Sequence, residues 1–173
     1  LANGPVPVGT RVSSLWLLGL GRGNCILASR HGTHFSYSII HGATRQDPAI
    51  LRAYRDEFQP SRELAAPSGN VACSVICADT EAAALAQRRL YEHHTGGSML
   101  VNVCGTPGQC RDQLHALAEK YAVDELVIMS LWHLLDRREE SYRMLAEKMG
   151  LTPLPPSEAA GAAIPSGGQG WAG

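Results

Sequence analysis

Short apolar runs alternate with amphipathic stretches along most of the sequence, and no other feature limits the possible folds as strongly. The apolar runs predict strands at 15–18, 34–40, 71–78 and 125–130. Caps and helical spacing predict helices at about 24–31, 47–58, 79–94, 106–121 and 136–149. A strand–helix unit repeated about four times predicts an α/β protein whose parallel strands are joined by helical crossovers. A doubly wound sheet and a β/α barrel both fit, although four units make only half of an eight-unit barrel.

Local signals refine several of these elements. The continuous apolar run Leu15–Leu18 is closed by Gly19, a pattern typical of a strand that is buried on both faces. Cys73 and Cys77 are four residues apart on a strand and should point to one face. Residues suited to capping begin four of the helices: Asp47, Asp79 with Thr80, Thr106 and Asp136.

Glycines mark the ends of two predicted helices. Gly32 stands where the first helix should stop, and Gly150 stands where the last helix should stop. The last helix should carry Leu145 and Met149 on its apolar side.

The length of 173 residues, with 45% hydrophobic side chains, suggests one domain with a core of its own. Residues 1–12 are rich in Gly and Pro and predict an irregular lead-in. Residues 151–173 contain 14 Pro, Gly or Ala and predict a flexible tail. The chain opens at Leu1 without an initiator Met, so we expect either processing or a piece of a longer protein.

Charge and cysteine content exclude several classes of function. The 15 basic and 16 acidic side chains give a net charge of -1, which provides no electrostatic footprint for nucleic acid. No apolar run approaches the roughly 18 residues of a membrane span, so we expect a soluble protein. Five cysteines are an odd number and too few for a disulfide scaffold, which favours reduced thiols in a cytoplasm. A single bridge between two of them remains open.

A glycine-rich loop directly after the first predicted strand is the most informative stretch. It opens a helix and consists of Gly19, Leu20, Gly21, Arg22, Gly23 and Asn24. Glycines let the backbone approach a ligand, and a helix N-terminus offers free N–H groups to an anion such as a phosphate. Arg22 could add a charged hydrogen bond. The alternative is a tight strand-to-helix turn that binds nothing.

The loop does not match the common nucleotide motifs. Its pattern is GxGxGN rather than GxGxxG, and the next strand ends at 38–42 without an acid that could bind a ribose. The Gly-Lys-Ser/Thr end of a P-loop is also missing. From the residues alone, the chain is therefore a candidate phosphate-binding α/β protein.

The histidines give weaker indications. His41 follows the second predicted strand at the end where α/β active sites gather, and Trp132 with His133 follows the strand at 125–130. His93 and His94 end a helix, where a cation suits the helix dipole. No CxxC or HExxH spacing indicates a metal, and spacing alone identifies no catalytic residue.

Four segments in order resemble the C-terminal half of the bacterial luciferase-like flavin-dependent monooxygenases. They are LWLLGLGRGNCILASRHGTHFSYSII, ILRAYRDEFQPS, NVACSVICADTEAAALA and VCGTPGQCRDQLHALAEKYAVDELVIMS. The last is the most specific, because it resembles the Val-Gly-Thr-Pro helix start and the Asp-Glu-Leu strand of that family. The resemblance covers about Leu15 to Leu151, and it implies that residues 13–150 are half of a β/α barrel.

The resemblance implies a cofactor and a reaction. Reduced flavin, usually FMN, would activate oxygen to oxidise a small organic substrate, and some branches use a deazaflavin for hydride transfer instead. The loop 19–24 matches the family's loop that helps to hold the flavin phosphate. Gly21 and Asn24 stand where many relatives carry Ser or Thr, and Arg22 could compensate for the lost hydroxyls. The connection at 93–98 is much shorter than in relatives.

The first half of the barrel, which carries the family's usual catalytic His and Cys, has no counterpart in this sequence. We therefore expect the chain to pair with an N-terminal half-barrel or with further copies in a homo- or hetero-oligomer, because unpaired strand edges are costly. The first functional hypothesis is part of a monooxygenase that is active only with its N-terminal half. The alternatives are a non-catalytic flavin-binding module and a subunit that completes a partner's barrel. The substrate cannot be read from these residues.

Overall fold

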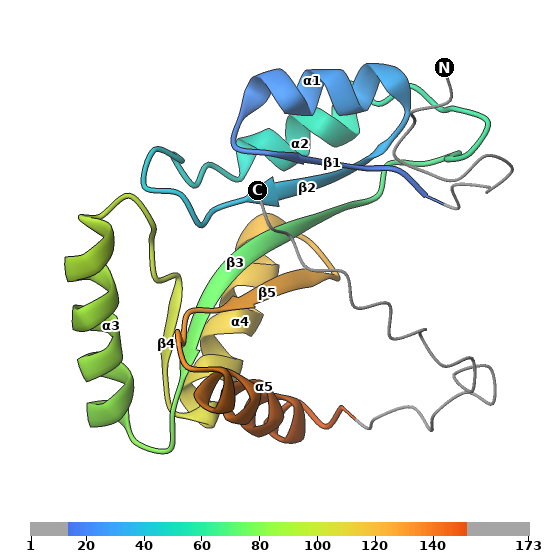
Figure 1. The fold of residues 1–173 in the computed structure, drawn as a ribbon. Coiled ribbons are helices and arrows are strands. Elements are labelled where there is room, and N and C mark those ends of the chain that lie inside the picture. The colour runs from blue at the N-terminus through green and yellow to red at the C-terminus, as the bar shows by residue number, and fades with distance from the viewer. Residues whose placement is uncertain (1–13, 152–173) are drawn as a thin grey trace, which may run out of the picture.

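Strands and helices alternate throughout residues 14–151, the part of the chain that the computed structural model describes (Figure 1). The predicted lead-in at 1–12, and the predicted tail beyond its first residue, lie outside the described residues. The elements are β1 (Trp16–Gly19), α1 (Arg22–His31), β2 (His34–Ser38), α2 (Ala49–Asp56), β3 (Gly69–Cys77), α3 (Glu81–Thr95), β4 (Val103–Gly105), α4 (Pro107–Tyr121), β5 (Leu126–Ser130) and α5 (Leu135–Lys148). The predicted α/β architecture is confirmed. Within the described part, no helix is long and apolar enough to cross a membrane.

All strand pairs are parallel, and the nine-residue strand β3 lies at the centre of the sheet. On β3, the Ala72 carbonyl accepts a hydrogen bond from Ile39, the residue after β2, and the N–H of Ala78, the residue after β3, donates to Gly105 of β4. The Val75 carbonyl accepts from Leu131, the residue after β5. Alternate residues of a strand point their backbone groups to opposite edges. It follows that β2 and β4 share one edge of β3 and that β5 occupies the other.

The short strand β4 is absent from the sequence prediction. It has only three residues and pairs with Val75–Cys77, beyond the point where β2 has ended. The side chain of Asn102 fills the gap between β2 and β4, because it donates to the Ile39 carbonyl and accepts from the Ser74 N–H, at 3.0 and 2.9 Å. Residues 14–151 thus contain five strand–helix units, of which four contribute longer strands than β4.

One face of the sheet is covered by helices and holds the main core. Phe35, Tyr37, Val71, Cys73 and Cys77 are fully buried there, against α1, α2, α4 and α5. The predicted common face of the two strand cysteines is confirmed. Figure 1 shows α1 and α2 over β1 and β2, with α4 behind β3 and β5. The helix α3 lies elsewhere and packs on β4 and on Ile76, which points to the opposite face of β3.

The expectation that β1 is buried on both faces is wrong for the described residues. Leu17 packs on the core, but Trp16 and Leu18, on the other face, are 37% and 61% exposed. The physical reason is that β1 is an edge strand whose second face no described element covers. A continuous apolar run indicates that both faces of a strand suit apolar surroundings. It does not indicate that other elements of the same chain cover both faces.

The residues predicted to begin and end the helices are confirmed at Thr106 and Gly32, and two predicted N-caps are corrected. Thr106 and Gln109 form the predicted capping box, and Gly32 ends α1 in the left-handed conformation with φ 57°. Asp136 is not the N-cap of α5, because Leu134 holds that position and Asp136 lies inside the first turn. Asp47 accepts from the Ala49 N–H at 2.9 Å, one residue ahead of the N-cap position.

The last helix differs from prediction in its apolar side. Leu145 is buried in the main core, whereas Met149 lies just beyond the helix and is exposed. Gly150 follows with φ 70°, as expected for a residue that ends a helix.

Candidate functional site

The carboxyl ends of the strands meet at one edge of the sheet, because all strands run parallel. Ligands of α/β proteins bind at this edge. Five connections reach it within the described residues: 19–24 after β1, 39–44 after β2, 78–80 after β3, residue 106 after β4 and 131–134 after β5.

The loop after β1 brings the six predicted cofactor-binding residues together in one turn. A Cβ on Gly19 would overlap with the Asn24 side chain, so only glycine fits there. The Asn24 side chain donates from Nδ2 to the Leu18 carbonyl at 3.2 Å. Gly19 and Asn24 therefore close the turn, which leaves Asn24 less free to contact a ligand than the sequence suggests.

The N-terminus of α1 offers unpaired donors to solvent. Its N-cap, Gly21, is extended and has no side chain to cap the helix, and the first turn holds no acidic residue. The first helical hydrogen bond runs from Cys25 to Gly21, so the N–H groups of the three residues between them have no partner within the helix. By contrast, α3 is capped by Thr80 and α4 by a capping box.

The space beside this turn is open. A Cβ built on Gly21 or on Gly23 meets no atom within 4 Å, so neither glycine is required by packing among the described residues. The turn is solvent-exposed at Leu20 and Gly23. An anion could reach the helix N-terminus without a rearrangement of the backbone.

Arg22 does not point at this space. Its guanidinium forms an ion pair with Glu57, with Nη2 and Oε1 2.8 Å apart, and the two side chains are 63% and 42% exposed. An exposed pair of this kind is worth at most about 1 kcal/mol. The predicted contact of Arg22 with a phosphate therefore requires that Arg22 leave Glu57, which costs little.

The histidines and Trp132 have mostly structural surroundings. His41 is exposed, and its backbone forms an isolated bridge with Met99. The Trp132 indole donates to the Cys77 carbonyl at 3.1 Å, which anchors the loop after β5 to the end of β3. His94 contacts the Leu90 carbonyl in the last turn of α3, as expected for a residue near a helix C-terminus.

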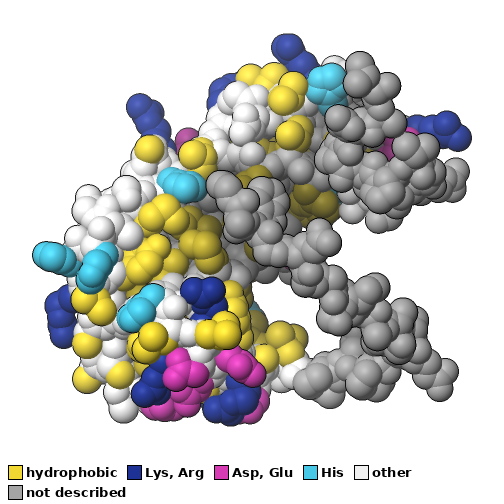
Figure 2. All heavy atoms as spheres, viewed as in Figure 1, with side chains coloured by type: hydrophobic (Ala, Val, Ile, Leu, Met, Phe, Trp, Pro, Cys, Tyr) yellow, Lys and Arg dark blue, Asp and Glu magenta, His cyan; other side chains and the backbone are white. Residues whose placement is uncertain are grey.

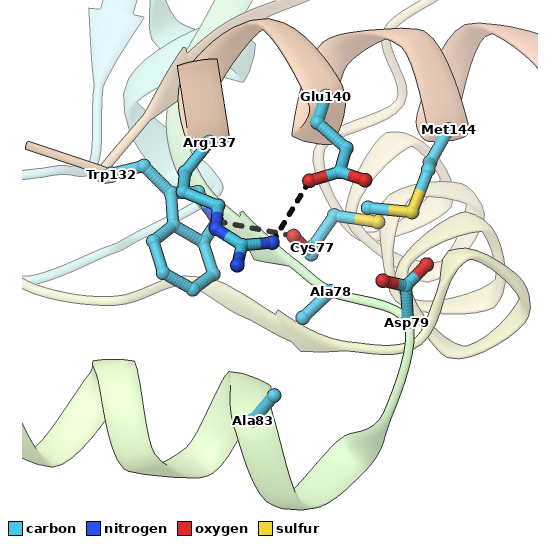
Figure 3. A pocket seen from close by; sticks show the side chains of 8 residues that line it. All are labelled: Cys77, Ala78, Asp79, Ala83, Trp132, Arg137, Glu140 and Met144. Carbon is cyan, nitrogen blue, oxygen red and sulfur yellow. Dashed lines mark hydrogen bonds and ion pairs between the residues drawn. The ribbon is translucent and has the colours of Figure 1, made fainter. Parts of the chain in front are cut away.

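A small pocket of about 170 Å³ lies between the ends of β3 and β5 (Figure 3). Its walls come from the end of β3, two loops and two helices, and comprise Cys77, Ala78, Asp79, Ala83, Trp132, Arg137, Glu140 and Met144. Arg137 and Glu140 form an ion pair at 3.0 Å. The sequence analysis missed this pocket, although Asp79 and Trp132 both follow predicted strands, a signal that could have placed them at one edge.

The second face of the sheet combines polar and apolar side chains. His34 stacks on Trp16 with ring centroids 4.4 Å apart, and Asn70 donates from Nδ2 to Glu125 at 3.3 Å. The Nδ1 of His34 and the Oδ1 of Asn70 are buried without a hydrogen-bond partner among the described residues. Figure 2 shows histidines beside exposed hydrophobic side chains on the molecular surface in view. Within residues 14–151, no three His, Cys, Asp or Glu side chains lie close enough together to hold a metal ion.

No family model matches the sequence. Two curated relatives from Bacillus subtilis (strain 168) do: the uncharacterized proteins YwcH and YceB are 24% and 26% identical over 165 and 163 residues. Each alignment takes in 77% of this chain and 49% of the relative. The chain therefore spans about half the length of the curated relatives it matches.

Solved structures agree with this proportion. The crystal structure of apo-MsnO8 superposes with a TM-score of 0.70 at 28% identity, over 88% of this chain and 56% of that chain. The fold is half of a luciferase-like barrel. Monooxygenase RslO1 from Streptomyces bottropensis and the long-chain alkane monooxygenase LadA superpose with TM-scores of 0.59 and 0.57, at 14% and 12% identity. They match 79% and 81% of this chain with 47% and 42% of their own chains.

The half-barrel explains the free edges of the sheet. Within the described residues, no strand pairs with the outer edge of β1 or of β5. Two of the solved structures that share this fold, RslO1 and LadA, are monooxygenases. In a complete barrel the second face of the sheet, with His34 and Asn70, lines the interior.

Proposed function

We propose that the chain forms the C-terminal, flavin-binding half of a luciferase-like flavin-dependent monooxygenase that oxidises a small organic substrate. The observation that carries the proposal is the open, uncapped N-terminus of α1 at the carboxyl edge of a half-barrel. The solved structures with this fold include a riboflavin lyase with a modified FMN, which supports a flavin as the ligand.

The residues of the turn fit a flavin phosphate. The free N–H groups after Gly21 would donate to the phosphate oxygens, and the open space at Gly21 and Gly23 would admit them. The turn supplies no hydroxyl side chain, so backbone donors and Arg22 would hold the charge. Reduced FMN, or a deazaflavin as the alternative, would supply the electrons for the reaction.

The other half of the barrel is part of the proposal. It would cover Trp16 and Leu18 on β1 and Val127 and Met129 on β5, which are exposed at the two edges of the second face. It lies either in the same polypeptide or in a separate chain. All five cysteines are free, which is consistent with the cytoplasmic location that we propose.

Native mass spectrometry of the protein from its own source is the first test. We expect a complex that contains a complete barrel together with the mass of one flavin. A bare half-barrel without flavin would contradict the proposal.

A charge placed in the turn tests the phosphate contact directly. Gly23→Glu puts a carboxylate in the first turn of α1, where it stabilises the helix by about 0.3–1 kcal/mol but repels a phosphate. In the completed barrel, we expect FMN to bind at least about tenfold more weakly. Riboflavin, which lacks the phosphate, should bind unchanged. Gly23→Gln is the matched control without charge.

A barrel-completing subunit without its own flavin contact is the second candidate. The Glu57 carboxylate favours it, because it lies beside the turn and already neutralises Arg22. In this case Gly23→Glu and Gly23→Gln would bind FMN equally well. The completed barrel would still form.

A further inference from the structure

Two cysteines meet where β3, β4 and α4 come together. Cys77 is the last residue of β3 and pairs in the ladder with Gly105 of β4. Cys110 lies in the first turn of α4, and its Sγ is 3.5 Å from the Gly105 carbonyl oxygen and 3.7 Å from that of Ile76. Both side chains are fully buried in the main core.

The two thiols are not equivalent. The Cys110 thiol donates to the carbonyl oxygens of Gly105 and Ile76, which places it beside Cys77, and this neighbour lowers the pKa of the Cys77 thiol despite its burial. The neighbouring Cys77 and burial together raise the pKa of the Cys110 thiol. Cys77 is therefore the better nucleophile of the two, since the thiolate is the reactive form.

Cys77 also has a route to solvent. It forms part of the wall of the pocket in Figure 3, with Met144 of α5 and Asp79 labelled near it. The volume of about 170 Å³ admits a molecule the size of a small peroxide. Cys110 is not part of that wall and is fully buried.

We propose that Cys77 and Cys110 are a reversible dithiol–disulfide pair, oxidised by a small hydroperoxide that enters this pocket. The Cys77 thiolate attacks the terminal oxygen of the hydroperoxide and the O–O bond breaks, so the OH group stays on sulfur as a sulfenic acid and the remaining alkoxide takes up a proton and leaves as an alcohol. The Cys110 sulfur then attacks the sulfenic sulfur, an S–S bond forms and water leaves. In total, two thiols lose two electrons and two protons, and the hydroperoxide is reduced to an alcohol and water. The pair is independent of flavin and goes beyond the proposed function.

The chain provides a matched control in Cys73. It lies on the same face of the same strand as Cys77 and is fully buried, and burial alone raises its pKa to about 12. It does not line the pocket. Cys104, on β4, is half-buried and pairs in the ladder with Ile76, so it lies on the opposite face of the sheet from Cys77 and serves as a second control.

The experiment exposes the reduced 173-residue chain to hydrogen peroxide, blocks the remaining thiols by alkylation and maps the peptides by mass spectrometry. Trypsin leaves Cys73 with Cys77 in one peptide and Cys104 with Cys110 in another. The Cys73→Ser and Cys104→Ser variants therefore identify the partners. We expect the loss of two of the five thiols, one bridge between these peptides in the wild type and in both variants, and full recovery with dithiothreitol.

Cys77→Ser and Cys110→Ser should each abolish the bridge. Five thiols left after oxidation would overturn the proposal, as would a bridge that disappears in Cys104→Ser. Oxidation of Cys77 that dithiothreitol does not reverse would overturn it as well. If a serine variant does not fold, fragmentation of the two bridged wild-type peptides in the mass spectrometer identifies the bonded cysteine in each.

Discussion

The two faces of the sheet differ in how their side chains match their surroundings. On the helix-covered face, Phe35 and Val71 are apolar and fully buried, as in any closed core. On the second face Ile76 is buried beside α3, but the polar Asn70 in the middle is also only 3% exposed, whereas Leu18 and Val127 at the edges are 61% and 44% exposed. Among the described residues, the first face is therefore closed, whereas the second leaves apolar side chains exposed at both of its edges.

Removal of a large side chain from the covered face should have the largest effect. Phe35 packs against Tyr54 with ring centroids 5.5 Å apart, and a Phe-to-Ala change in a core costs about 3–5 kcal/mol. We expect Phe35→Ala to lower the free energy of unfolding by this amount in urea titrations followed by circular dichroism. A loss below about 1 kcal/mol would mean that this face is not a packed core.

Alkaline pH should also act on the covered face. Burial raises the pKa of Tyr121 to about 12, and its hydroxyl donates to the Gln46 carbonyl at 2.9 Å. The unfolded chain releases this proton near pH 10 while the folded chain keeps it, so stability is fully present below pH 10 and declines toward pH 12. The decline attributable to Tyr121 is about 2–3 kcal/mol.

Unfolding of Tyr121→Phe at each pH provides the control for that decline. The variant should depend less on pH between 10 and 12 than the wild type. Equal slopes for the two proteins would remove Tyr121 from the explanation.

The Leu18→Ala variant tests whether the second face contributes to association rather than to the stability of the chain alone. Because Leu18 is mostly exposed in this chain, we expect a change within about 0.5 kcal/mol in the unfolding of the chain alone. Association with the other half-barrel should weaken by about 1–2 kcal/mol, or roughly 5- to 30-fold, as measured by calorimetric titration. Unchanged association would show that β1 does not face the partner half.

The smallest effect is expected at Asn70, whose buried Oδ1 has no partner among the described residues. Asn70→Leu removes this unpaired acceptor and should raise the free energy of unfolding by up to about 1 kcal/mol. Ser74→Ala, on the same strand and face, should lower it instead, because Ser74 bonds to Asn102 through both N–H and hydroxyl. A loss of stability in Asn70→Leu would indicate that its oxygen is already satisfied.

The sequence predicted those features that depend on neighbouring residues. The capping box at Thr106, the left-handed Gly32 and the shared face of Cys73 and Cys77 each follow from local spacing. The strand β4 was missed because three residues are too short for a periodic signal. The run Leu15–Leu18 has the composition of a strand covered on both faces, yet composition cannot tell whether the cover lies in the same chain.

In the candidate site, too, the features that depend on neighbouring residues were predicted, and those that depend on distant residues were not. The turn 19–24 was found because its residues are contiguous, and the structure adds that Asn24 closes it and that Arg22 is held by Glu57. The pocket with Asp79 and Arg137 joins loops that are far apart in the sequence, so only the fold brings them together. The same holds for the pair of Cys77 and Cys110.

The two free edges of the sheet also determine how the chain behaves without its other half. Because β1 and β5 run parallel and expose opposite edges, β5 of one copy can pair with β1 of the next in a head-to-tail contact. Such a contact closes into a ring when the rotation per copy allows it and otherwise grows into a filament. A preparation of the chain alone at high concentration is therefore expected to polymerise through its strand edges. Addition of the other half-barrel should occupy these edges and stop the growth of the polymer.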